Sequence, residues 1–261
     1  MKRLVAAVLL CFGLSGLAEA ADLNIAPTGH LRAVYLGGNP AQAIQNAATG
    51  ESRGVVVDLS NEFGRRIGVP VAITPVAGVP AVIEAVRDGR ADIGFVAYDP
   101  SRAGTVEFSQ TYMLVMQTFL VLKDSGLRSV EELDRSGLKI GAGRGDSIAL
   151  FLRRSLKQAT LVEGTDPSPA VAKRMLSDRA VDAFGGNRQR LTTVAREDPD
   201  YRLLQGDVFG VPQAIIVPKG KPSALMAVNR FIDEMRVSEF LKASIERSGV
   251  IGVEVAPPSD R

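Results

Sequence analysis

Residues 54–96 read GVVVDLSNEFGRRIGVPVAITPVAGVPAVIEAVRDGRADIGFV, and this stretch decides the fold class. Apolar residues recur at helical spacing from Leu59 to Ile67, so the sequence predicts a helix over residues 58–68. A second helix is expected over residues 80–88. Strands are expected at residues 31–36, 54–57, 71–75 and 91–96. This alternation is typical of a parallel sheet with helices on its faces.

The rest of the chain repeats the alternation without repeating the sequence. Strands are expected at residues 119–122, 138–142, 180–184 and 214–217. Helices are expected from Ser129, where a capping box begins, and over residues 147–156, 168–177, 187–196 and 221–235. Residues 254–261 read as a loose tail. The sequence therefore predicts two sets of strands and helices within one α/β protein.

The first residues have the composition of a secretory signal. A positive start at Lys2 and Arg3 precedes an apolar run, and Ala18-Glu19-Ala20 fits the small-residue cleavage pattern. We therefore expect residues 1–20 to be removed and the protein to be exported to the periplasm. A retained membrane anchor is the rival interpretation. Cys11 is the single cysteine, so an exported chain without it has no disulfide to stabilise it.

Composition narrows the function classes. Hydrophobic residues make up 46% and charged residues 23% of the chain, which are ordinary values for a globular protein. The net charge is +2, with lysine and arginine scattered, so no basic surface for nucleic acid is expected. One histidine and one cysteine make a transition-metal site improbable. No cofactor is expected.

Polar turns follow three of the predicted strands. They are Asp99-Pro-Ser-Arg102, Gly143-Arg-Gly-Asp146 and Gly185-Gly-Asn187. Ligands of open α/β sheets bind at the carboxyl ends of the strands. These three turns are therefore the expected place for a small-molecule site.

An ordered series of motifs resembles the solute-binding proteins of amino-acid-type ABC importers, solute-binding protein family 3. The series is made up of the stretch at 54–76, VIEAVRDGRADIGF at 82–95, SR-x5-FSQTY at 101–112, SVEELDRSGLKIGAGRGDS at 129–147, VDAF at 181–184 and PQAIIVPKG at 212–220. The resemblance implies a two-lobed type II periplasmic binding protein fold, each lobe a mostly parallel sheet flanked by helices. Lobe 1 is expected to comprise residues 21–112 plus 207–261, and lobe 2 residues 113–206.

The resemblance implies a role for the turn after residue 96. Arg102 stands six residues before Phe108, where the family has an arginine that binds the α-carboxylate of the ligand. A planar guanidinium matches a carboxylate with two parallel hydrogen bonds. The family usually has threonine or serine where this chain has Asp99. Asp99 is either a ligand contact or the acceptor of an Asx turn. Tyr98 is expected to supply aromatic surface to the ligand.

The resemblance also implies ligand contacts in lobe 2. Asp146 and Ser147 stand at a predicted helix start, where family members bind the carboxylate with backbone N–H groups. A helix N-terminus offers unpaired donors to an anion, although Asp146 also suits a plain N-cap. Asn187 stands where the family has the carboxylate that binds the ligand's ammonium group. A neutral amide binds an ammonium less strongly, which puts an ordinary α-amino acid ligand in doubt.

The resemblance implies a periplasmic receptor for a small carboxylate-bearing solute, an amino acid or a related compound. Its partner would be an inner-membrane ABC permease, and the receptor is expected to be monomeric and without catalytic activity. Two alternatives stay open. The same fold hosts periplasmic dehydratases, for which Asp99 and Asp146 are the candidate acid and base. A protein-interaction module that has lost ligand binding is the other.

Overall fold

The structure is a computed structural model that describes residues 25–258. The predicted signal at residues 1–20, with Cys11, and the end of the predicted tail at 259–261 lie outside the described residues. Within the described part, no helix combines the length and the apolar character needed to cross a membrane. His30 is exposed, on the loop before the first strand.

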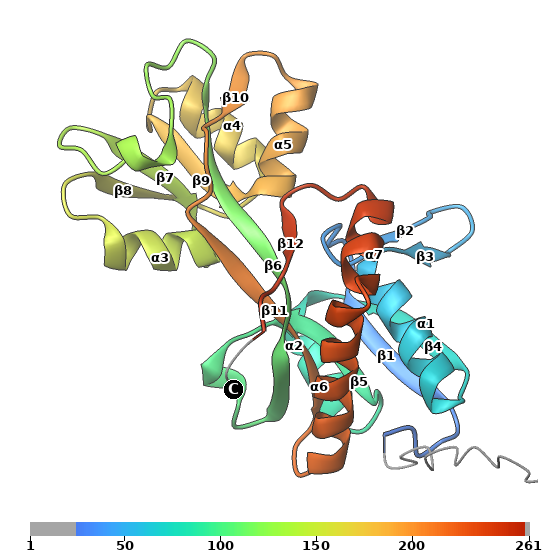
Figure 1. Cartoon of the computed structure of the whole chain (residues 1–261). Helices are drawn as coiled ribbons and strands as arrows, with labels where there is room; N and C mark the ends of the chain where they lie inside the picture. Colours follow the sequence, from blue (N-terminus) through green and yellow to red (C-terminus); the bar gives the residue numbers. More distant parts are fainter. Residues whose placement is uncertain (1–24, 259–261) are drawn as a thin grey trace, which may run out of the picture.

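One mixed sheet runs through the whole molecule (Figure 1). Its main path has the order β4-β1-β5-β11-β6-β9-β7-β8. The strands on this path are β4 (Val71–Val76), β1 (Leu31–Leu36), β5 (Ile93–Ala97), β11 (Phe209–Pro218), β6 (Val106–Leu122), β9 (Ala183–Asn187), β7 (Lys139–Gly143) and β8 (Thr160–Gly164). β4, β1 and β5 are parallel to one another, as are β9, β7 and β8, whereas the pairs that involve β6 or β11 are antiparallel.

The two parallel sets belong to two lobes joined by β6 and β11 (Figure 1). β12 (Val253–Val255) and β10 (Tyr201–Leu203) also pair with β6, and β2 (Ile44–Gln45) forms a small hairpin with β3 (Ser52–Arg53). The expected boundary between residues 112 and 113 falls inside β6, and that between 206 and 207 falls just before β11. The mixed α/β architecture predicted from the sequence is confirmed.

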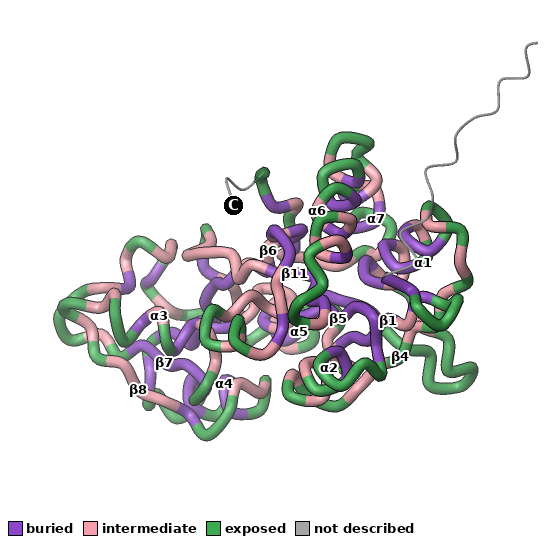
Figure 2. The backbone as a smooth tube through the Cα atoms, turned by 90° about the horizontal axis from the view of Figure 1, so that it is seen from below, coloured by how far each residue is buried: buried purple, intermediate pink, exposed green. Residues whose placement is uncertain are grey.

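Helices cover the sheet in both lobes and separate its buried residues into distinct cores. The first lobe has α1 (Val55–Ile67), α2 (Gly78–Arg87), α6 (Pro222–Val237) and α7 (Phe240–Ser248); the second has α3 (Ser147–Ser155), α4 (Pro169–Ser177) and α5 (Arg188–Glu197). Two single-turn 3-10 helices are η1 (Pro100–Arg102) and η2 (Val130–Glu132). Buried residues cluster separately in each lobe, along the strands and the inner helix faces (Figure 2).

The strand predicted at residues 54–57 is wrong, because α1 begins at Val55. Val55 and Val56 are both buried in the core of the first lobe, so tertiary packing overrides the β-propensity of the valine run. Gly54 precedes the helix with a φ of 140°, and a Cβ there would lie 2.7 Å from the carbonyl oxygen of Gln42. The predicted stop at Gly68 is confirmed, since Gly68 caps α1 in the left-handed conformation.

The strand predicted at residues 180–184 is shifted, and the structure places it at β9. The sequence predicts a turn at Gly185 and Gly186, but both lie inside the strand. A Cβ on Gly185 would come within 2.7 Å of the Phe119 ring and 2.8 Å of Ile148. Glycine is therefore needed at this position for close packing rather than for a turn.

Three further expectations are corrected. β6 spans residues 106–122, whereas the sequence predicted a strand over 119–122 alone. The predicted capping box at Ser129 opens a single 3-10 turn, η2, in which the Ser129 side chain makes no cap hydrogen bond. The predicted tail is partly ordered, because β12 pairs with β6 and Ala256 is 2% exposed.

Candidate ligand-binding site

The first-lobe half-site consists of Tyr98, Asp99 and Arg102, which follow the carboxyl end of β5. Asp99 begins η1, and its Oδ1 accepts hydrogen bonds from the Ser101 backbone N–H at 3.0 Å and the Ser101 hydroxyl at 2.7 Å. These contacts form the predicted Asx turn. Arg102 Nε lies 3.2 Å from Asp99 Oδ2, and both side chains are 35% exposed. The turn therefore presents a guanidinium that is paired on one side and open to solvent on the other.

The charge of Asp99 is well stabilised. The Ser101 hydroxyl lowers the pKa of the carboxyl group most, and the Ser101 backbone N–H and the Arg102 charge lower it further. Asp99 is therefore ionised at neutral pH, and the Asp99–Arg102 pair is neutral overall. A general acid near neutral pH needs a raised pKa, so Asp99 is poorly suited to that role.

A buried glutamine, which the sequence analysis did not single out, links β1 to β5, the strand that leads to the first-lobe half-site. Gln42 is 1% exposed. Its Oε1 accepts a hydrogen bond from the Leu36 N–H at 2.9 Å, and its Nε2 donates to the Phe95 carbonyl at 3.2 Å. Gln42 thus ties the ends of β1 and β5 together. Tyr98 packs its ring edge against Phe108, with centroids 5.2 Å apart.

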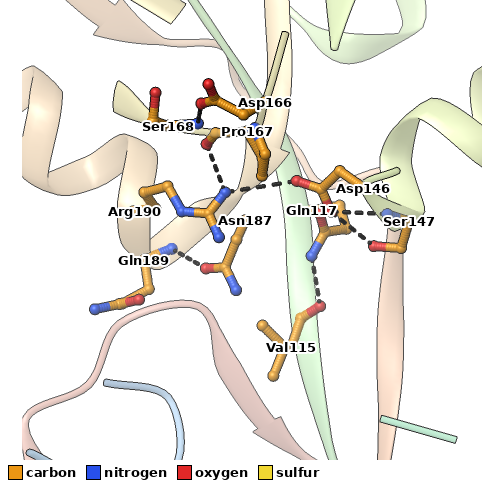
Figure 3. A network of polar contacts seen from close by, with 10 residues as sticks. All are labelled: Val115, Gln117, Asp146, Ser147, Asp166, Pro167, Ser168, Asn187, Gln189 and Arg190. Carbon is orange, nitrogen blue, oxygen red and sulfur yellow. Dashed lines mark hydrogen bonds and ion pairs between the residues drawn. The ribbon is translucent and has the colours of Figure 1, made fainter. Parts of the chain in front are cut away.

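The second-lobe half-site consists of Asp146, Ser147, Asn187 and Arg190 (Figure 3). β7, β8 and β9 are parallel, so the loops that follow them meet at one edge of the sheet. Asp146 comes from the loop after β7, and Asn187 ends β9. Arg190 lies in the first turn of α5 and reaches both Asp146 and the carbonyl of Pro167 in the loop after β8. The structure thus brings the turns after β7 and β9 together in the second lobe, while the ligand site expected there stays a prediction.

Asp146 and Asn187 both cap helices, a role that the sequence analysis had raised for Asp146 alone. Asp146 Oδ1 accepts hydrogen bonds from the Ser147 backbone N–H at 2.7 Å and from the Ser147 hydroxyl at 3.3 Å. Asn187 Oδ1 accepts from the Gln189 N–H at 3.0 Å at the start of α5. The Ser147 N–H, one of the donors expected to bind a ligand carboxylate, is therefore already occupied by Asp146.

Sequence reasoning missed two residues of this region, Arg190 and Gln117. Arg190 stands three residues after Asn187 on a predicted helix, so the spacing of residues on one helix face could have indicated it. Gln117 lies on β6, where the neighbouring strand changes from β12 to β9, and it pairs with Asn187 in register. Gln117 is 2% exposed, and its Oε1 is buried without a hydrogen-bond partner. No local signal marks such a position, because it depends on the register between distant strands.

The two half-sites belong to different lobes. In this conformation no hydrogen bond or ion pair within residues 25–258 joins Arg102 to Asp146 or Asn187. The lobes approach each other beside the second-lobe half-site. A cavity of about 130 Å³ there is lined from the first lobe by Pro40 and Ile44 and from the second by Gln189 and Thr193. Among the described residues, no three or more histidine, cysteine, aspartate or glutamate side chains are placed to hold a metal ion.

Fold and sequence together identify the class of protein. The family described as bacterial extracellular solute-binding proteins, family 3, matches residues 31–248. The chain belongs to this family.

Two curated relatives are glutamine-binding proteins. The chain is 25% identical over 177 residues to the glutamine-binding protein of Geobacillus stearothermophilus, a match that covers 66% of each protein. It is 24% identical over 201 residues to the ABC transporter glutamine-binding protein of Bacillus subtilis (strain 168), which covers 74% of this chain and 71% of that protein. The chain thus spans slightly less than two thirds of the Geobacillus protein.

Solved structures share the fold at low sequence identity. An amino acid ABC transporter substrate-binding protein from Streptococcus pneumoniae bound to L-arginine has a TM-score of 0.63 at 21% identity, covering 86% of this chain and 96% of that chain. A binding component of an ABC transporter from Wolinella succinogenes, complexed with lysine, has a TM-score of 0.66 at 22% identity, covering 84% and 95%. An ancestral amino-acid-binding protein described as a precursor of cyclohexadienyl dehydratase has a TM-score of 0.64 at 22% identity, covering 85% and 96%.

Proposed function

We propose that this chain is the solute receptor of an ABC importer and binds a small polar solute with a carboxylate between its lobes. The observation that carries the proposal is Arg102. Its guanidinium follows the carboxyl end of a central strand on a one-turn helix, and the side chain is 35% exposed beside its contact with Asp99. A guanidinium in this position suits a ligand carboxylate. Tyr98 supplies an aromatic surface beside it.

Lobe 1 is proposed to comprise residues 21–112 plus 207–261, and lobe 2 residues 113–206. Since β6 and β11 are the long strands that run through both lobes, a bend in this pair is the simplest hinge. Ligand binding would then shift the equilibrium toward a closed form, which an inner-membrane permease would recognise. The receptor is proposed to act as a monomer.

Binding without catalysis fits the half-sites better than the dehydratase alternative. The two candidate acid–base groups, Asp99 and Asp146, both cap helices and both face arginines. The interaction-module alternative is favoured by no specific contact of the described residues.

The proposal is tested by native mass spectrometry of freshly purified protein, followed by thermal-shift screening of small carboxylic acids and amino acids. A co-purified molecule of a few hundred daltons or less, or an acid that raises the melting temperature, is expected. Small-angle scattering with the best acid should then show a smaller radius of gyration. Protein that carries no small molecule and is stabilised by none of the acids would contradict the proposal.

Export is proposed to remove residues 1–20. N-terminal sequencing of protein recovered from the periplasm should begin at Ala21. A sequence that begins at Met1 would show that the leader is retained.

A further inference from the structure

The orientation of the Asn187 carboxamide is fixed by its role as a helix cap. Its Oδ1 accepts the Gln189 N–H at 3.0 Å, so the oxygen must face the start of α5. The other end of the amide, Nδ2, points away from this cap and from the contacts between Arg190 and Asp146 (Figure 3). Nδ2 has no hydrogen-bond partner in the part of the chain that the structure describes. Asn187 therefore offers the site two free N–H donors, while its oxygen is held at the helix cap.

Arg190 adds further donors beside Asn187. Its Nη1 donates to the Pro167 carbonyl at 2.8 Å and lies 3.5 Å from Asp146 Oδ2. Its Nε and Nη2 make no hydrogen bond to residues 25–258, and the side chain is 35% exposed. The guanidinium is thus held in place by one nitrogen while its remaining N–H groups stay available to a ligand.

Asp146 provides no free acceptor to balance these donors, because both of its carboxylate oxygens already have partners. Oδ1 accepts two hydrogen bonds from Ser147, and Oδ2 faces Arg190. Its side chain is 15% exposed. The one acceptor without a partner nearby is Gln117 Oε1, whose orientation is set by the bond from Nε2 to the Val115 carbonyl at 3.2 Å.

These contacts decide which ligand group suits the second lobe. An ammonium group has three N–H donors that need acceptors, and burying it without them is costly. The second-lobe half-site offers free donors from two side chains. Both Asp146 oxygens already have partners, and the unpartnered acceptor beside the half-site, Gln117 Oε1, is neutral. A carboxylate or carbonyl oxygen instead finds donors on Asn187 and Arg190.

We propose that the second-lobe half-site binds an electronegative group of the ligand, so that the solute is a small carboxylic acid with no ammonium group facing this lobe. A dicarboxylate or a keto acid has this chemistry. One carboxylate would lie on Arg102 and the second acceptor group on Asn187 and Arg190. This inference rests on the proposed function, because it requires one ligand to bridge both lobes.

The test uses pairs of probes in which one member has an ammonium group and the other has hydrogen or a keto oxygen in its place. Succinate is compared with L-aspartate, glutarate with L-glutamate, and pyruvate with L-alanine, by calorimetric titration of the mature protein. In the pair that binds, the ammonium-free acid is expected to bind at least about tenfold more tightly, the equivalent of about 1.4 kcal/mol.

The Asn187→Asp variant sharpens the test because aspartate is an equally good N-cap and keeps the shape of the side chain. It replaces the free N–H donors with a carboxylate oxygen, so the preference within the same pair should shift toward the amino acid by at least about tenfold. Arg154→Ala is the control, since Arg154 is exposed in the last turn of α3 and should leave both affinities unchanged. Circular dichroism confirms that the variants are folded.

Three outcomes would overturn the inference. If wild-type protein binds the amino acid of a pair more tightly than its ammonium-free partner, the inference fails while the receptor proposal stands. If Asn187→Asp leaves the preference unchanged, the amide does not contact the ligand and the inference fails as well. If no member of any pair binds, this inference is overturned. The receptor proposal is then contradicted as well only if native mass spectrometry also finds no bound molecule.

Discussion

The two half-sites are built in opposite ways. In the first lobe, Asp99 and Arg102 lie three residues apart on one turn and pair with each other. In the second lobe, Asp146 comes from the loop after β7 and Arg190 from the first turn of α5, and they meet at the sheet edge. Each half-site therefore holds an arginine against an aspartate, one by local chain geometry and the other by tertiary packing. The first-lobe pair should therefore tolerate substitutions in the neighbouring strands, whereas the second-lobe pair should be sensitive to them.

The largest effect is expected from Arg102→Ala. Loss of one partner of a desolvated charge pair costs about 2–5 kcal/mol, which corresponds to a loss of affinity of roughly 30-fold to several-thousand-fold. Arg102→Lys should fall between, because a point charge replaces a two-pronged donor. Calorimetric titration with the best acid measures both variants. Arg90→Ala is the matched control, since Arg90 is 61% exposed on the same lobe. A folded Arg102→Ala variant that binds within threefold of wild type would remove Arg102 from the site.

The second prediction concerns the strand that carries Asn187. Gly185→Ala should destabilise the protein by about 1–3 kcal/mol, because the added methyl group meets Phe119 and Ile148 at 2.7 and 2.8 Å. Gly186→Ala should be tolerated, since its nearest neighbour, Leu191, is 3.5 Å away. Urea unfolding measures both variants. Equal stability of the two would show that the second-lobe half-site does not depend on close packing of β9.

Asp99→Asn separates the two roles left open for Asp99. Asparagine can still accept the Ser101 N–H, so the turn remains, while the charge that competes for Arg102 is lost. Exposed ion pairs contribute about 0.2–1 kcal/mol, so affinity for a carboxylate should rise by up to about fivefold. Titration with the same acid measures the change. A drop in affinity would mean that the Asp99 carboxylate contacts the ligand itself.

The smallest effect concerns acid stability far from both half-sites. Arg65 and then Arg66 lower the pKa of Glu62 from 4.5 to about 2. The ionised form favours folding, so its contribution is full above pH 4.5 and is lost as the pH falls from 4.5 to about 2. Because Arg65 is 70% exposed, the contribution should be about 0.5 kcal/mol. Urea unfolding of wild type and Glu62→Gln should differ at pH 7 and agree near pH 2. A constant difference at both pH values would contradict this assignment.

The same contrast explains which features could be predicted from the sequence. Arg102 and the Asx turn at Asp99 are local, and the residues between them were enough to predict the turn. The cap at Asp146 was likewise indicated by its position before a predicted helix, whereas the cap at Asn187 was not predicted. Gln117, Gln42 and Arg190 were missed because their contacts depend on strand register and on which loops meet. Val55–Val57 misled the prediction because a buried valine run satisfies either a strand or a buried helix turn.

The account is tested most directly by a crystal structure of the protein with the acid that stabilises it most. It predicts that both guanidinium prongs of Arg102 hold a ligand carboxylate, and that Asn187 Nδ2 donates to an oxygen of the same molecule from the other lobe. The proposed binding mode would be contradicted by a ligand that contacts one lobe alone while Arg102 stays paired with Asp99 and does not contact the ligand.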